Sequence, residues 1–174
     1  TIVRGVPDLV LILLVFFGGQ VTLNNIGAVT GLWSYVEVSQ FAAGAGTIGV
    51  IFGAYFTETF RGAIMAIPRG QIEAGISCGM RKPLIFRHII WPQMIRFALP
   101  GFTNNWLVQL KTTALVSVIG LQDLVYNAFT AGRSTGQLFT FMAAAFVIYL
   151  LLTGISDLLL RAVERRYNRG VVRA

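Results

Sequence analysis

Four long apolar stretches alternate with polar or basic segments along the chain. They cover residues 9–17, 41–60, 95–119 and 138–160, and a polar stretch around Asn24 and Asn25 follows the first of them. A helix needs about 20 apolar residues to cross a bilayer. The first stretch is shorter than this, so we expect it to recruit residues 18–23, to tilt, or to be partly shielded by protein. The pattern predicts four membrane-spanning helices.

The composition favours a membrane protein built from helices. Apolar residues make up 55% of the 174 residues and charged residues 12%, and the mean hydropathy is +0.71. A water-soluble domain has a far more polar composition. The sequence shows no alternation of polar and apolar residues of the kind that a membrane β-barrel requires. Its 19 glycines suit helices that pack closely in a bilayer. We therefore predict an all-α, polytopic transmembrane helical bundle in contact with lipid.

Arginine and lysine residues gather on two segments that lie two predicted crossings apart. Of the 14 basic residues, six lie in or beside the link between the second and third stretches and five follow the fourth: Arg61, Arg69, Arg81, Lys82, Arg87 and Arg96, then Arg161, Arg165, Arg166, Arg169 and Arg173. Basic residues are enriched in cytoplasmic loops. We therefore expect both segments, the C-terminus and Arg4 on the cytoplasmic side. The net charge of +7 reflects this topology, and no nucleic-acid partner is expected.

Residues 68–92 are neither a membrane span nor an ordinary loop. Pro68 suits the first turn of a short helix, Gly79 can end that helix in the left-handed conformation, and Pro83 can open a second one. Apolar and basic residues of both helices are expected to form a knob on the cytoplasmic face: Ile72 and Ile76, then Leu84, Ile85 and Ile89 beside Lys82 and Arg87. Such a knob could dock into a groove of a soluble partner.

The spacing within this segment resembles that of a known family. Membrane subunits of binding-protein-dependent ABC importers carry Glu-Ala-Ala, three residues, Gly, nine residues, Ile, one residue and Leu-Pro. Five residues match that pattern and two depart from it: Glu73, Ala74, Gly79, Ile89 and Pro92 match, while Gly75 stands where Ala is usual and Trp91 where Leu is usual. The resemblance implies that residues 68–92 form a cytoplasmic coupling helix segment that inserts into an ATPase subunit. It also implies that ATP is bound by that partner.

Other parts of the chain resemble one branch of this family, the polar amino-acid permeases. The resemblance lies in residues 4–7, 53–62 and 110–120, and residues 6–8 and 164–167 are similar to the Q-type subunit of importers for histidine, lysine, arginine and ornithine, or for opines. It implies a type I ABC importer permease-like fold and a bacterial inner-membrane location. The implied partners are ATP-binding ABC subunits, a second permease subunit, similar or identical, and a periplasmic or extracellular amino-acid binding protein.

Residues 1–174 are expected to form a single transmembrane permease domain. Members of the family usually carry one more helix at the N-terminus, so we expect this sequence to lack the first span. The substrate would cross by alternating access, driven by the ATPases. The rival interpretation is an ATP-independent secondary transporter or channel subunit. It would call for inverted repeats or an acidic proton relay, and we find neither in the four stretches.

Several polar residues fall inside the apolar stretches and are candidates for the substrate path. Glu58 lies three residues before Arg61, close enough on a helix to form an ion pair; unpaired, it would attract a cationic substrate. Another group falls near one helical face of the third stretch: Asn105, Gln109, Thr112, Thr113 and Ser117. This stripe could line a watery path or form hydrogen bonds between helices.

Two further ionisable residues have expected structural roles. Lys111 would repel a cationic substrate unless it is neutralised, so we expect a partner such as Asp123 or Glu58. Asp123 could also cap a short helix through Ala131 in the outer link, residues 121–137. In the family that the chain resembles, this outer link is where a solute-binding protein docks.

Motifs for ATP hydrolysis and metal binding are missing. No Gly-x-x-x-x-Gly-Lys-Ser/Thr phosphate loop and no His-Glu-x-x-His zinc motif occurs. The single cysteine, Cys78, permits no internal disulfide, and His88 is the single histidine. We expect a non-catalytic subunit with no cofactor and no metal site.

Overall fold

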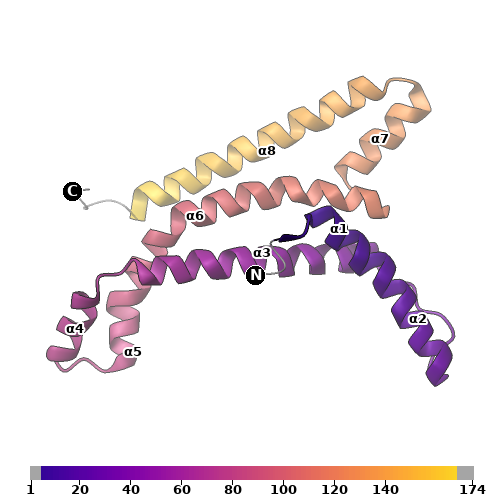
Figure 1. Cartoon of the computed structure of the whole chain (residues 1–174). Coiled ribbons are helices and arrows are strands. Elements are labelled where there is room, and N and C mark those ends of the chain that lie inside the picture. The colour runs from indigo at the N-terminus through magenta and orange to yellow at the C-terminus, as the bar shows by residue number, and fades with distance from the viewer. Residues whose placement is uncertain (1–4, 168–174) are drawn as a thin grey trace. The chain divides into compact units, whose positions relative to one another are not determined.

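The structure is a computed structural model, and it describes residues 5–167. All secondary structure in that range is helical, as Figure 1 shows, which confirms the predicted all-α class. Three basic residues used to predict the topology, Arg4, Arg169 and Arg173, lie outside the described residues.

The helices contribute to two compact units. The first unit comprises residues 1–54 and 108–153, and the second comprises residues 55–107 and 154–174. Three long helices supply residues to both units: α3 (Gln40–Met65), α6 (Trp91–Thr112) and α8 (Leu138–Tyr167). Each unit therefore brings together parts of the chain that are distant in sequence.

The first membrane helix is longer than predicted. It is a run of 23 residues formed by α1 (Asp8–Leu13), the π-helical turn η2 (Leu14–Gly18) and α2 (Gly19–Thr30). Asn24 does not end it, because Asn24 Oδ1 accepts a hydrogen bond from Val36 N at 2.8 Å and Nδ2 donates to Val36 O at 3.1 Å. Gln20 Oε1 likewise accepts from Val38 N at 2.7 Å. The extended chain after α2 thus satisfies these amides, and the helix continues through them.

The second predicted helix is confirmed as α3 and continues to Met65. In the first unit, α3 lies close to the 3-10 helix η4 (Thr113–Ile119), because a Cβ on Gly44 would be 2.8 Å from Val116 Cγ1. Ile48 and Ile51 of α3 are buried there. A glycine at this contact permits the close approach of two helices that membrane proteins use for packing.

The third predicted helix begins much earlier than expected. The helical run extends from Lys82 to Ile119 through α5 (Lys82–Ile85), the π-helical turn η3 (Phe86–Ile90), α6 and η4. The prediction of a separate short helix that stops before Pro92 is therefore wrong. A proline inside a helix lacks one hydrogen-bond donor and clashes with the preceding turn. The π-helical turn η3 ends at Ile90, two residues before Pro92, and its wider turn gives room for the ring, so the helix continues.

The last two helices are α7 (Leu124–Thr135) and α8. Asp123 caps α7 as predicted, because its Oδ1 accepts a hydrogen bond from Tyr126 N at 2.8 Å. The helix is four residues longer than expected and ends at Gly136 in the left-handed conformation, with φ of 70°. Among the residues of α8, Ala145 is buried and most large apolar side chains are exposed, as expected for contact with lipid or another subunit.

Two helical runs, Asp8–Thr30 and Leu138–Tyr167, are each long and apolar enough to cross a membrane. The number rises to four if each of two bent pairs counts as one span: α3 with α4 (Arg69–Ser77), bent by 62°, and the run from Lys82 to Ile119 with α7, bent by 51°. The predicted number of four crossings is the upper end of this range.

Candidate coupling segment and polar membrane residues

The first arm of the coupling segment, residues 68–92, is helix α4. It ends in a Schellman motif, in which Gly79 N donates to Ile76 O (2.9 Å) and Met80 N donates to Gly75 O (3.0 Å). Gly79 has φ of +74°, as predicted for a left-handed helix end. Pro68 differs slightly from the prediction, since it lies just before the first helical residue. The motif turns the chain sharply toward α5.

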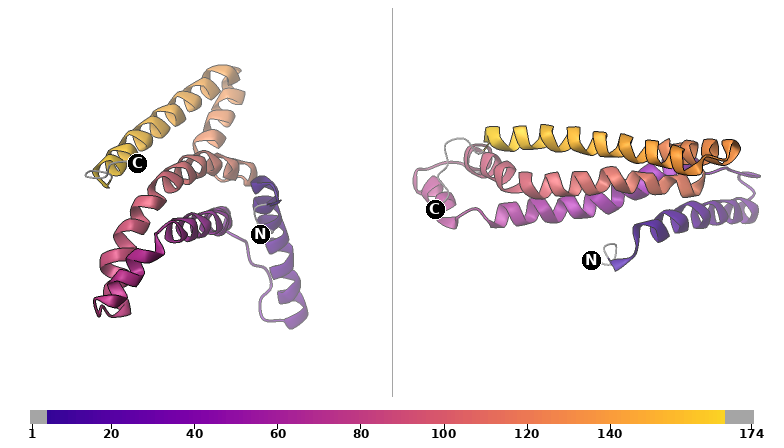
Figure 2. Two further views of the ribbon diagram at one scale, coloured as in Figure 1. Left: turned by 60° about the vertical axis from the view of Figure 1, so that its left-hand side comes forward. Right: turned by 90° about the horizontal axis from the view of Figure 1, so that it is seen from above.

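The second arm, formed by α5 and η3, packs directly on α4. A Cβ on Gly75 would lie 2.8 Å from Ile89 Cδ1 and 3.4 Å from Ile85 Cγ1, and Ile85 is only 4% exposed. Figures 1 and 2 show α4 and α5 side by side from three directions. Gly75 therefore has a packing reason for its departure from the family pattern, because an alanine would force Ile89 to move.

A hydrogen bond between two side chains also joins α4 to α6. Gln93 Nε2 donates to Gln71 Oε1 and to Ile89 O, the latter at 2.9 Å. The same region contains a small buried core: Ala63, Ile67, Met94 and Ala98, with Ile90 and Ile95 packed against it. These contacts hold α4, the end of α3 and the start of α6 in one arrangement.

The outer surface of the coupling segment is both apolar and charged. Ile76 is 60% exposed and Leu84 is 46% exposed. Ile85 and Ile89, which we expected in the docking knob, instead face α4. Glu73, Ala74 and Pro92 are exposed, and Glu73 forms no ion pair within the described residues. Four basic side chains are exposed as well: Arg69, Arg81, Lys82 and Arg87.

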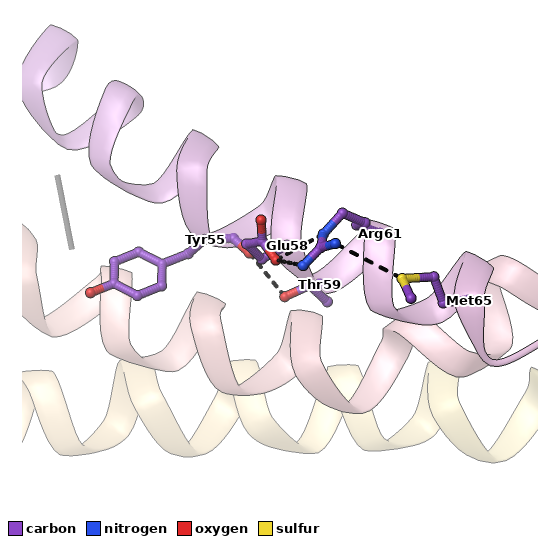
Figure 3. Close-up of polar contacts among 5 residues, drawn as sticks. All are labelled: Tyr55, Glu58, Thr59, Arg61 and Met65. Carbon is purple, nitrogen blue, oxygen red and sulfur yellow. Dashed lines mark hydrogen bonds and ion pairs between the residues drawn. The ribbon is translucent and has the colours of Figure 1, made fainter. Parts of the chain in front are cut away.

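Glu58 and Arg61 form the ion pair that their spacing predicted. Arg61 Nη2 lies 2.8 Å from Glu58 Oε2, and Arg61 Nε donates to the same oxygen at 3.0 Å. Figure 3 shows the two side chains together on α3, with Arg61 also reaching toward Met65. The Glu58 side chain is 34% exposed and that of Arg61 is 65% exposed. The carboxylate is therefore largely neutralised by its neighbour.

Asn105 forms a hydrogen bond between helices. Its Nδ2 donates to Thr59 Oγ1 at 2.9 Å, and Thr59 Oγ1 donates to Tyr55 O at 3.1 Å. This bond joins α6 to α3 within the second unit, and the rings of Phe56 and Phe102 stack at 5.0 Å beside it. For Asn105, the alternative of hydrogen bonding between helices is confirmed.

Three of the four remaining residues of the predicted stripe form hydrogen bonds within their own helical run. Thr112, Thr113 and Ser117 bond to backbone carbonyls of their own helical run, at 3.1, 2.7 and 2.8 Å. From Thr113 onward the chain is a 3-10 helix, whose tighter turn shifts successive side chains away from the α-helical face. Thr112 is buried, Gln109 and Ser117 are half-buried, and Thr113 is exposed.

The prediction of a partner for Lys111 is wrong. Lys111 is exposed, and within residues 5–167 it forms no ion pair. Glu58 is engaged by Arg61, and Asp123 Oδ1 caps α7. Because the spacing rules for helices relate only neighbouring turns, they did not determine which acid would lie near this amine.

A cavity in the first unit was not anticipated from the sequence. Its volume is about 230 Å³, and eight residues line it: Phe41, Ala45, Ile48, Thr113, Val116, Leu121, Asp123 and Tyr149. We call it the Asp123 cavity. Asp123 Oδ2 is buried and has no hydrogen-bond partner in the described chain. The signal in the sequence was an acidic residue between Leu121 and Leu124, which we assigned to helix capping or to an ion pair with Lys111.

Two stretches, residues 75–79 and 132–136, spell Gly-x-Ser-x-Gly, the letters of a hydrolase nucleophile motif. That motif requires a strand before the serine and a helix after it. Here Ser77 Oγ donates to Glu73 O and Ser134 Oγ donates to Ala131 O, both at 3.0 Å and both in helices. Neither serine hydroxyl forms a hydrogen bond with another side chain among the described residues. That part of the chain also holds no group of three potential metal-ligating side chains.

Comparison with known proteins identifies the family of this chain. The chain matches the family of binding-protein-dependent transport system inner membrane components over residues 1–169. It belongs to this family.

Two relatives show which members of the family this chain is similar to. The histidine/lysine/arginine/ornithine transport system permease protein HisQ of Escherichia coli (strain K12) is 50% identical over 174 residues, which are 100% of this chain and 76% of that protein. The octopine transport system permease protein OccQ of Rhizobium radiobacter is 44% identical over 173 residues, 99% of this chain and 73% of that protein. Both are permease subunits, as the sequence resemblance implied.

A solved structure confirms the fold class. A chain in the crystal structure of an amino acid ABC transporter with histidines is 33% identical and superposes with a TM-score of 0.76. The match covers 95% of this chain and 72% of that chain.

Proposed function

We propose that the chain is the transmembrane subunit of an ATP-driven importer that moves basic amino acids across the inner membrane by alternating access. The observation that carries the proposal is the coupling segment, which keeps Gly75 and Ile89 in internal contact and exposes Glu73, Ile76 and Leu84. The substrate class is supported by relatives named for histidine, lysine, arginine and ornithine transport and for octopine transport.

The energy for transport comes from a separate chain in this proposal. An ATP-binding subunit receives the exposed apolar side chains of the coupling segment in a groove, and the surrounding basic residues and Glu73 orient the contact. The permease itself performs no catalysis and holds no cofactor. Its role is to convert movement of the ATPase into movement of the membrane helices.

The contacts within the second unit explain how that movement is passed on. A push on α4 reaches η3 through the contact of Gly75 with Ile89, and reaches α6 through the bond between Gln71 and Gln93. Because Pro92 does not interrupt the helix, the displaced segment is continuous with the run that ends at Ile119. Rigid packed elements transmit such shifts with little loss.

The proposed assembly has the coupling segment and the C-terminus in the cytoplasm. A second permease subunit completes the pore, and lipid covers the outward-facing apolar side chains of α8. An amino-acid binding protein delivers the substrate from the periplasmic or extracellular side. The basic residues between α3 and α6 and those at the end of α8 support this orientation.

The candidate path residues divide into two groups. Glu58 and Asn105 are held by Arg61 and Thr59, which supports a structural role for both. Four residues stay as candidates for contact with the substrate: Gln109, Thr112, Thr113 and Ser117. The hydroxyl groups of Thr112, Thr113 and Ser117 are used once each as donors to backbone carbonyls and keep lone pairs that can accept a further hydrogen bond.

Co-purification of the ATPase subunit tests the proposal. Replacing exposed Ile76 by Asp removes an apolar contact without disturbing the internal packing, and Glu73→Trp adds bulk at the docking surface. We expect both variants to lose the ATPase from the purified complex. Leu32→Asp is the matched control, because Leu32 is 75% exposed but lies outside the coupling segment. An ATPase that stays bound to both coupling variants would refute docking through residues 68–92.

A further inference from the structure

The last turns of α8 carry paired and unpaired arginines on neighbouring faces. Arg161 Nε lies 2.8 Å from Asp157 Oδ2, one helical turn earlier. Arg165 and Arg166, one turn further on, are exposed and form no ion pair within residues 5–167. A guanidinium keeps its charge at any physiological pH. The ion pair therefore accounts for Arg161 and leaves two positive charges without a partner in the described chain.

An exposed apolar stripe leads up to these two arginines. Residues three, four and seven positions apart share one face of a helix. Six residues at the end of α8 fall on such a face, and all of them are exposed: Ile155, Leu158, Leu159, Ala162, Arg165 and Arg166. Leu158 is 69% exposed and Leu159 is 64% exposed. We call this face the α8 stripe, and it lies wholly within the second unit.

The α8 stripe changes from apolar to basic over a distance that matches the edge of a bilayer. Figure 1 shows α8 as one unbroken helix, and it is long and apolar enough to cross a membrane. The six residues from Leu159 to Arg165 rise about 9 Å, and the headgroup region of one leaflet is about 5–7 Å thick. When the leucines contact hydrocarbon, the guanidinium groups therefore reach the phosphates.

A phospholipid with a negatively charged headgroup matches both parts of the stripe. A guanidinium donates paired hydrogen bonds to phosphate oxygens, and the leucines offer apolar surface to an acyl chain. Ala162, the smallest side chain of the stripe, leaves room between the two parts for the glycerol backbone. A soluble anion would gain nothing from the leucines. A lipid without net charge would gain less from the arginines.

We propose that the α8 stripe binds an anionic phospholipid, with its phosphate at Arg165 and Arg166 and an acyl chain along Ile155, Leu158 and Leu159. The orientation proposed above places this lipid in the cytoplasmic leaflet. The binding itself depends neither on the transported substrate nor on the ATPase. It assigns to the end of α8 a preference for one class of lipid, beyond its role as a membrane span.

The test titrates the detergent-purified importer complex with two lipids and counts the bound lipids by native mass spectrometry. Dioleoylphosphatidylglycerol carries a negative headgroup, and dioleoylphosphatidylcholine has the same acyl chains but no net charge. We expect the anionic lipid to bind more tightly. The Arg165→Gln/Arg166→Gln variant should lose about fivefold in affinity for it per arginine replaced, the scale of a basic residue near an anionic membrane surface. Its affinity for phosphatidylcholine should not change.

Further variants separate charge, face and apolar contact. Arg165→Lys/Arg166→Lys keeps both charges and should retain most of the affinity. Asp157→Asn/Arg161→Gln is the matched control, because it removes the paired charges from the neighbouring face of the same helix without changing the net charge. Its affinity for the anionic lipid should stay unchanged. Leu158→Ala/Leu159→Ala should weaken both lipids to the same extent, because both have the same acyl chains.

Four results would overturn the inference. Two are an unchanged affinity of the Arg165→Gln/Arg166→Gln variant for the anionic lipid and an equal loss in the control variant. The third is displacement of the lipid by millimolar glycerol phosphate, which would assign the arginines to a soluble phosphate. The fourth is equal lipid binding before and after Leu158→Ala/Leu159→Ala. ATP-driven arginine uptake, measured in parallel on the unchanged importer, tests the proposed function separately.

Discussion

The coupling segment and the end of α3 around Glu58 belong to the same unit but are held together in different ways. In the coupling segment, contacts join residues far apart in sequence, Gly75 with Ile89 and Gln71 with Gln93. Around Glu58, the ion pair joins residues three positions apart on one helix. A pair on adjacent turns needs only the helix, whereas the other contacts need the folded unit. Substitutions should therefore matter more in the coupling segment.

The largest effect is expected at Gly75. Gly75→Leu places a side chain where even a Cβ would lie 2.8 Å from Ile89 Cδ1, and overpacking of this kind costs about 1–3 kcal/mol. We expect ATP-driven uptake by reconstituted importer to fall by about tenfold or more. Gly70→Leu is the control in the same helix, because no atom lies within 4 Å of a Cβ on Gly70. Equal effects of the two substitutions would contradict the role of close packing.

A smaller effect is expected at the bond between Gln71 and Gln93. Gln93→Leu keeps the approximate side-chain size and removes two hydrogen bonds, those from the amide to Gln71 Oε1 and to Ile89 O, each of which contributes about 0.5–1.5 kcal/mol. We expect the amino acid imported per ATP hydrolysed to fall by a factor of about two to ten, while the ATPase stays bound.

The double variant with Gln71→Leu shows whether the two glutamines act together. If they do, it should lose little more than the single variants. Losses that simply add would show that each side chain acts through other contacts. Gln122→Leu is the matched control, since Gln122 is exposed in the outer link.

The smallest effect is expected at the ion pair of α3. Both partners are substantially exposed, and pairs of this kind contribute at most about 1 kcal/mol. Glu58→Gln should therefore change the uptake of arginine at low concentration by no more than about twofold. A loss of tenfold or more, seen for arginine but not for a neutral substrate, would show that Glu58 contacts the substrate. It would then contradict our expectation that substitutions matter more in the coupling segment than at this ion pair.

Much of the helical architecture was predictable, but the joints between helices were not. Hydropathy located all four long helices, although Asn24 was taken as a linker residue and Pro92 as a break. Both misinterpretations have one cause. A polar residue or a proline ends a helix only when nothing nearby satisfies its hydrogen bonds or makes room for its ring. Here the backbone of Val36 satisfies the Asn24 side chain, and the π-helical turn η3 makes room for the ring of Pro92.

The candidate site was predictable to a similar degree. The family pattern located the coupling segment, and its Gly79 turn has the expected conformation. The division between exposed and internal residues was not predictable, because Ile76 and Ile85 look alike in the sequence. Ile76 is 60% exposed and Ile85 is 4% exposed, since the Ile85 side chain of α5 packs against Gly75 of α4.

The sequence by itself determined the features that depend on residues within a turn or two. These are the apolar helices, the left-handed end at Gly79, the cap at Asp123 and the ion pair between Glu58 and Arg61. Only the tertiary structure decided that the Ile89 side chain packs against Gly75 and that Asp123 Oδ2 is buried without a hydrogen-bond partner among the described residues. Local conformation follows from short-range sterics and hydrogen bonds, whereas burial depends on which distant segments the fold brings together.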